Sequence, residues 1–73
     1  MGKVETKGIK KYAYMKRIPY WKIAEQLGVS EMWVYRHLRQ SEIEEADAEN
    51  IIAAIDSAVH ERDKEALSDR EGE

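Results

Sequence analysis

The chain has 73 residues, 42% of them apolar, and a net charge of −3, so it can form one small hydrophobic core and has no uniformly basic surface. It contains no cysteine, which excludes both disulfide bonds and thiolate-bound zinc. No apolar stretch approaches the ~18 residues of a membrane helix, and the segment MGKVETKGIKK lacks the apolar region of a signal peptide, so we expect a soluble protein of the cytosol.

The first predicted helix covers residues 6–17. Thr6 is placed to cap it, and Ile9 and Ala13, four residues apart, form a narrow apolar edge on an otherwise basic segment. Residues 1–5 offer nothing to bury, and we expect them to be flexible.

A break and a tight turn delimit the next two helices. Pro19 interrupts the helical pattern and suits the first turn of a new helix, which predicts a helix over residues 19–27. Gly28 stands where a helix end needs a residue tolerant of positive φ, and Ser30 is a natural N-cap, so the following helix spans residues 30–39. The intervening turn is too short for the two helices to pack side by side along their lengths, which predicts a steep crossing.

The last predicted helix covers residues 44–66 and follows an anchoring Ile43. Its apolar stripe consists of three residues at helical spacing, Ile51, Ile55 and Val59, widened by Ile52. Residues 67–73 are polar and are expected to form a flexible tail. Since no stretch alternates with period two, no β wing is expected. The chain is therefore predicted to be a compact all-α domain of four helices spanning residues 6–66.

Charge divides sharply between the two halves of the chain. Residues 1–40 contain nine Lys or Arg and three Asp or Glu, whereas residues 41–73 contain three and twelve. The local balances are +6 and −9, and screening makes local charge more important than the total. The N-terminal half is thus suited to an anionic partner and the C-terminal half is not.

The segment IAEQLGVSEMWVYRHLR, residues 23–39, has the spacing of a helix-turn-helix. A small Ala24 allows close helix approach, Gly28 turns the chain, and Val34 fills the angle between the helices. The supporting apolar positions are Ile23, Leu27, Val29 and Leu38. From Ile9 to Ile55 the chain resembles small phage and mobile-element proteins of the lambda-repressor/Cro-like helix-turn-helix class, with PYWKIAEQLGVSE and IIAAI as the most similar segments. It departs from that class in its last helix, which is acidic and runs on.

This resemblance implies that the helix over residues 30–39 enters the major groove of double-stranded DNA. Its candidates for base contact are Glu31, Met32, Tyr35 and Arg36. The candidates for phosphate contact are Lys16, Arg17, Tyr20, Lys22 and Arg39. The function that it implies is a sequence-specific transcriptional regulator of a phage or mobile element, working in the bacterial cytosol or nucleoid. Because one small unit reads few base pairs, we expect a homodimer on paired half-sites.

Two other functions are compatible with the same helix-turn-helix scaffold. The first is a protein-interaction module, such as an antirepressor or host-factor modulator, that binds its partner through the scaffold or the acidic last helix. Glu31 favours this function because it places a negative charge where DNA would be negative. The second is a recombination accessory protein that bends DNA. The candidate residues for a dimer or partner surface are Trp33, Ile52, Ala58 and Val59. Trp33 could instead cover the core or lie on DNA, and the tyrosines near the N-terminus could close the core or stack on single-stranded bases.

No catalytic or metal chemistry is expected. His37 and His60 are far apart in the sequence with no paired ligand, and the carboxylates between residues 42 and 49 fit a solvated helix face better than a cation site. Neither a phosphate-binding glycine loop nor a nucleophile elbow is present. We therefore expect neither an enzyme nor a cofactor.

Overall fold

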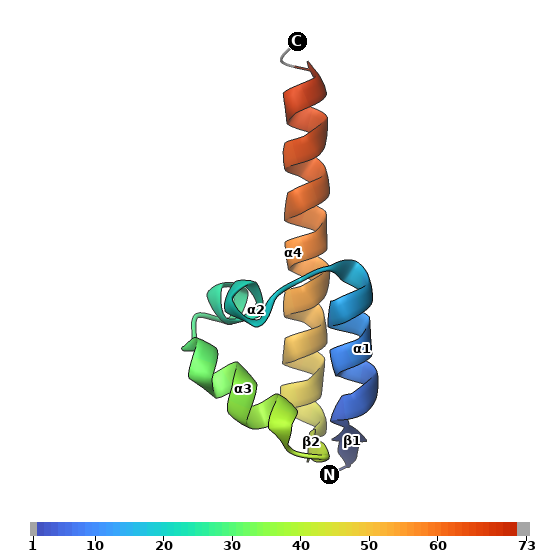
Figure 1. The fold of residues 1–73 in the computed structure, drawn as a ribbon, viewed down its shortest axis with the longest axis vertical. Coiled ribbons are helices and arrows are strands. Elements are labelled where there is room, and N and C mark those ends of the chain that lie inside the picture. The colour runs from blue at the N-terminus through green and yellow to red at the C-terminus, as the bar shows by residue number, and fades with distance from the viewer. Residues whose placement is uncertain (1, 72–73) are drawn as a thin grey trace.

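The computed structural model describes the backbone of residues 2–71 and the side chains of residues 2–66. Within these residues the fold is all-α with four helices, as predicted, plus one pair of very short strands (Figure 1). In chain order the elements are β1 (Lys3–Glu5), α1 (Thr6–Lys16), α2 (Tyr20–Leu27), α3 (Glu31–Arg39), β2 (Glu42–Glu44) and α4 (Glu45–Glu71).

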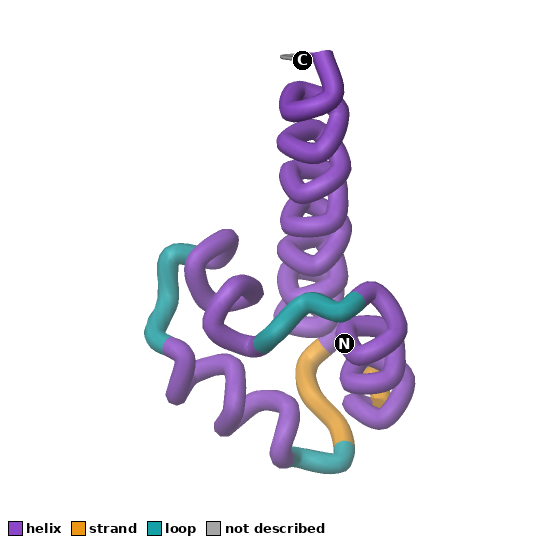
Figure 2. Tube along the Cα trace, turned by 45° about the horizontal axis from the view of Figure 1, so that its top comes forward, coloured by secondary structure: helices purple, strands orange, loops and turns teal. Residues whose placement is uncertain are grey.

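The long helix α4 forms the axis of the molecule. Helix α1 packs along one side of it, and α2 and α3 lie on the other side, with the α1–α2 connection crossing between them (Figures 1 and 2). The molecule measures 48 × 21 × 19 Å because α4 extends beyond the other helices. No helix of the described residues is long and apolar enough to cross a membrane.

One hydrophobic core joins all four helices. Its largest fully buried apolar side chains come from three of them, namely Ile23 of α2, Val34 and Leu38 of α3, and Ile51 and Ile55 of α4. Helix α1 adds Ile9 and Ala13, and Ile43 on β2 is buried as the predicted anchor. Burying such a side chain contributes roughly 1.5–3 kcal/mol, so these residues dominate the stability of the domain.

The turn between α2 and α3 has the local structure that the sequence predicts. Gly28 follows α2 in the left-handed conformation, with φ of 71°. The Ser30 hydroxyl accepts a hydrogen bond from the Trp33 amide at 3.2 Å and caps α3. Pro19 differs slightly from expectation, since it is the extended residue before α2 rather than its first helical residue.

The structure of the N-terminal segment contradicts the prediction that residues 1–5 have nothing to bury. Strand β1 pairs antiparallel with β2, with Val4 opposite Ile43, and Val4 packs half-buried against the core. Thr6 does not cap α1: it is the first helical residue, it is buried, and its hydroxyl donates to the Gln40 carbonyl just after α3. The N-terminal segment therefore fixes the end of α3.

The remaining differences concern helix ends: α3 begins at Glu31 and α4 at Glu45, each one residue later than predicted. Helix α1 ends at Lys16, one residue early, because Arg17 takes the left-handed conformation with φ of 59° and its amide donates to the Tyr14 carbonyl at 3.1 Å. Helix α4 continues to Glu71 rather than ending near residue 66. The rest of the predicted tail, residues 72–73, lies outside the described residues.

Two glycines provide a matched test of this backbone. Gly8 lies inside α1 with open space around it, so we expect Gly8→Ala to raise the free energy of unfolding by about 1 kcal/mol, since alanine favours helix. Gly28 also has open space, but its positive φ opposes any side chain, so Gly28→Ala is expected to lower that free energy by about 1–2 kcal/mol. Urea denaturation followed by circular dichroism measures both, and equal shifts would contradict the assigned conformation of Gly28.

Candidate nucleic-acid interface

Helix α3 turns one long face away from the rest of the molecule. Val34 and Leu38 anchor its inner side in the core, and the five outward side chains are exposed: Glu31, Met32, Tyr35, Arg36 and Arg39. Because successive helical residues are separated by about 100° around the axis, Met32 and Arg39 lie near the middle of this face, with Tyr35 on one side of them and Arg36 on the other. All four residues predicted to contact bases are therefore gathered on one accessible surface.

One flank of this face is formed by two tyrosines. Tyr20, at the start of α2, meets Tyr35 of α3 edge to face, with ring centroids 4.8 Å apart. Burial raises the pKa of Tyr20 above its ordinary value, and the neighbouring Tyr35 adds to that increase. Arg39 follows Tyr35 by one turn and lies beside Arg36, with which it lines a small hollow at the C-terminal end of the outward face.

The opposite flank faces α4. There the Trp33 ring stacks on the His37 ring with centroids 3.7 Å apart, and His37 Nε2 lies 3.5 Å from Asp47 Oδ2. Trp33 is half-buried and packs against the core, which places it at the side of α3 rather than on its outward face. This flank of the outward face therefore carries the carboxylate of Asp47.

Lys22, a predicted phosphate contact, forms ion pairs within the molecule. Its ammonium lies 3.5 Å from Glu25 Oε1 and 3.6 Å from Glu61 Oε1. Burial lowers the pKa of Lys22, but the two carboxylates outweigh that effect, so the pKa is raised above its ordinary value. The positive charge of Lys22 is thus largely neutralised, and the residue is a poor phosphate ligand.

Two other predicted phosphate contacts, Lys16 and Arg17, lie beside α4. They line a surface hollow together with Met15 and Arg62, and Arg62 donates to the Lys16 carbonyl at 2.6 Å. No described contact joins either residue to α3. Of the five predicted phosphate contacts, only Arg39 lies on the outward face of α3, and only Tyr20 borders it.

Only some of the residues predicted to form a dimer or partner surface are exposed. Ala58 is 1% exposed and belongs to the core, so its assignment to a partner surface is wrong. Val59 is half-buried, whereas Ile52 is exposed beside Val4 and Tyr12 in a mostly apolar hollow of about 360 Å³ between α1 and α4. The prediction missed this burial because the periodicity of α4 alone does not reveal how far the other helices cover it.

Sequence reasoning also missed a candidate surface on α1. We define the α1 basic face as Lys7, Lys10, Lys11 and Tyr14, all exposed. Their spacing of three, four and seven residues places them on one side of the helix, a signal that the sequence does contain. Among the described side chains, no carboxylate lies within 4.0 Å of the three ammonium groups. Their charges therefore remain available to an anion.

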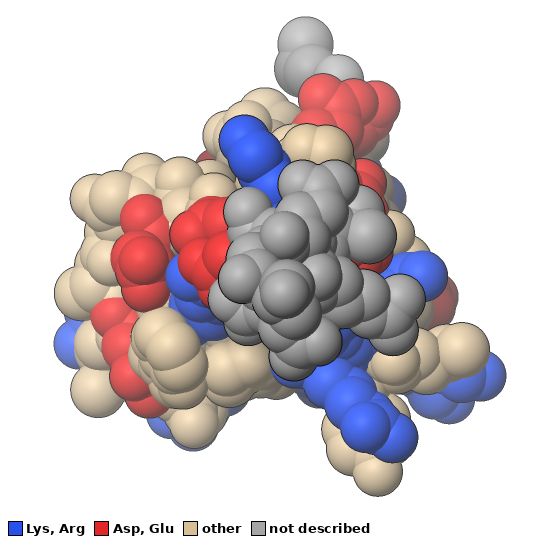
Figure 3. Space-filling view, turned by 90° about the horizontal axis from the view of Figure 1, so that it is seen from above, with Lys and Arg blue, Asp and Glu red and all other residues tan. Residues whose placement is uncertain are grey.

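Charged side chains are also unevenly spread over the end of the molecule from which α4 projects. Figure 3, viewed down α4, shows Lys and Arg without neighbouring Asp or Glu at the bottom and lower right, while at the left and the top Asp and Glu lie among further Lys and Arg. Charged groups on a surface act within about 10 Å, so such separation creates regions of distinct potential. A polyanion would therefore meet different potentials on different sides of the domain.

Comparison with protein-family models, curated proteins and solved structures finds no significant match for this chain.

Proposed function

We propose that the protein is a sequence-specific double-stranded DNA-binding regulator of transcription in a phage or mobile element, acting in the bacterial cytosol or nucleoid. The observation that carries the proposal is the outward face of α3, which is exposed along its whole length and set at an angle to α2 by the turn at Gly28. A helix held in this way can enter a major groove about 12 Å wide.

The outward side chains suit distinct roles in such a complex. Arg36, exposed on this face, can form two hydrogen bonds with a guanine edge, and Met32 can contact a thymine methyl group. Glu31 and Tyr35 can contribute further base contacts at the margin. Arg39, in the last turn of α3, and Tyr20, at the border of the face, suit phosphates, which fix the register of the helix. Regulation would then follow from occupancy of a promoter.

We further propose that two copies bind together, because one α3 covers too few base pairs for tight, specific binding. Ile52 is the most exposed apolar candidate for contact between copies, and Val59 and Trp33 are more covered. The alternative function, a protein-interaction module, is favoured by the exposed carboxylate of Glu31 in the first turn of α3. That charge would face phosphates in a DNA complex.

Selection of bound duplexes from a random pool at low salt tests this proposal. We expect enrichment of a palindromic sequence whose half-sites are separated by about 10 base pairs, or a multiple of that, because each copy presents one α3. Sedimentation on the selected duplex should give two copies per site. Absence of any enriched sequence, together with capture of a specific protein from a bacterial lysate, would favour the interaction module instead.

A further inference from the structure

The α1 basic face lies on the side of α1 that borders α3. Two contacts fix the rotation of α1 about its axis. Thr6 donates to the Gln40 carbonyl at the end of α3, whereas Tyr12 donates to Asp56 of α4. Since Lys10 follows Thr6 by four residues, it stands on the same edge of the helix as Thr6, away from α4. The ammonium groups of the α1 basic face are therefore directed away from the acidic helix.

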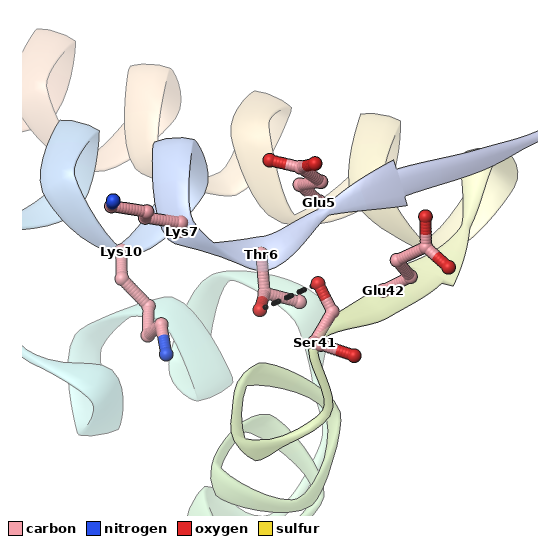
Figure 4. A pocket seen from close by; sticks show the side chains of 6 residues that line it. All are labelled: Glu5, Thr6, Lys7, Lys10, Ser41 and Glu42. Atoms are coloured by element: carbon pink, nitrogen blue, oxygen red, sulfur yellow. Dashed lines mark hydrogen bonds between the residues drawn. The ribbon is translucent and has the colours of Figure 1, made fainter.

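Lys10 also connects this face with the surroundings of α3. It lines one hollow with Ser41, the second residue after α3, and Figure 4 shows it with Lys7 on the α1 side of that hollow, with Glu5 and Glu42 toward the strands. It lines a second hollow of about 510 Å³, bounded by Lys11, Tyr14 and Tyr20. Tyr20 in turn contacts Tyr35 of α3. One continuous surface thus joins the α1 basic face to the outward face of α3.

The other side of α3 has the opposite charge. His37 faces Asp47 of α4 there, and the first turn of α4 carries Glu45 as well. A polyanion that covers the outward face of α3 is therefore repelled on the α4 side and attracted on the α1 side. Three unpaired ammonium groups and two tyrosine hydroxyl groups can bind phosphate oxygens along this path.

We propose that the DNA duplex whose groove receives α3 continues across the α1 basic face, where Lys10 and Lys11 bind backbone phosphates and Tyr14 lines the path. This inference rests on the proposed function and adds to it a second, sequence-independent contact surface and a direction for the duplex. The occupant is a phosphate backbone because the face offers cations and hydroxyl groups but no base-reading helix terminus.

The test is the salt dependence of duplex binding by the K10Q/K11Q variant of the full chain. Each lost phosphate contact makes the plot of log affinity against log salt concentration less steep by about 0.9, so we expect a change of about 1.8. Relative to 1 M salt, that change corresponds to a loss of roughly 60-fold in affinity at 0.1 M. The preference among duplex sequences should remain that of the unmodified protein, since no base contact is removed.

The matched control is K3Q/K64Q, which removes the same net charge. Lys3 pairs with Glu44 at 3.4 Å and Lys64 lies on α4, and neither belongs to the proposed path, so the slope should stay unchanged. Equal slopes for K10Q/K11Q and the unmodified protein would overturn the inference while leaving sequence-specific binding intact. Equal flattening by both double variants would also overturn it, because total charge would then account for the effect. Failure of the unmodified protein to bind any duplex would overturn the proposed function itself.

Discussion

Replacing Ile55 by alanine is expected to lower the free energy of unfolding by about 2–5 kcal/mol. The side chain is completely buried in the middle of α4, where the core residues of α1, α2 and α3 converge, and its loss leaves a cavity that a tightly packed core cannot close. A domain of this size is expected at the low end of the usual ~5–15 kcal/mol, so a large part of its stability would be lost. Thermal unfolding followed by circular dichroism should show a midpoint lower by roughly 10–30 °C.

Ile52→Ala is the matched control, since it makes the same change on the same helix. Ile52 is 36% exposed at the edge of the hollow beside Tyr12, so little packing is lost and the cost should stay below about 1 kcal/mol. If Ile52→Ala proved as destabilising as Ile55→Ala, α4 would be packed against the body by a different face.

The second large effect is expected at Arg36. Replacement by alanine should reduce the preference for the selected sequence over single-base variants by about 1–3 kcal/mol, or roughly 5- to 150-fold, because a bidentate contact with guanine is lost. Binding to unrelated duplexes should fall much less. Competition titrations with the selected duplex and its point variants measure the two quantities separately.

Two other arginines provide the comparison. Arg39→Ala should weaken binding to all duplexes by a similar factor, since Arg39, in the last turn of α3, suits a phosphate. Arg62→Ala removes the same charge from α4, where its guanidinium donates to the Lys16 carbonyl, and should leave the sequence preference unchanged. If Arg62→Ala lost the sequence preference, or if Arg36→Ala retained it, the proposed role of α3 in reading the DNA sequence would be wrong.

The features that the sequence predicted correctly are those that depend on neighbouring residues. Gly28 and Ser30 determine the end of α2 and the start of α3 through local backbone preferences, and the spacing of Val34 and Leu38 identifies the inner side of α3. The exposed candidates for base contact follow directly, because they occupy the remaining positions of the same short helix. Local chemistry was sufficient for both the motif and its outward face.

The features that the sequence did not predict depend on contacts between distant segments. Lys22 looks like a free cation until α4 brings Glu61 beside it, and Ala58 looks like a surface residue until the other helices cover it. Thr6 looks like a helix cap until the end of α3 supplies its acceptors. A three-residue strand has too little periodicity to be recognised, so β1 and its partner were missed for the same reason.

The packing of α4 also affects the order in which the domain can fold. Every residue proposed to contact DNA precedes Ser41, yet Ile51 and Ile55, against which the preceding helices pack, come later in the chain. Strand β1 likewise remains without its partner until Glu42–Glu44 has been made. During synthesis the portion proposed to contact DNA must therefore remain incompletely folded until most of α4 has left the ribosome, and a fragment ending at Gln40 would contain the outward face of α3 without the core that holds it in place.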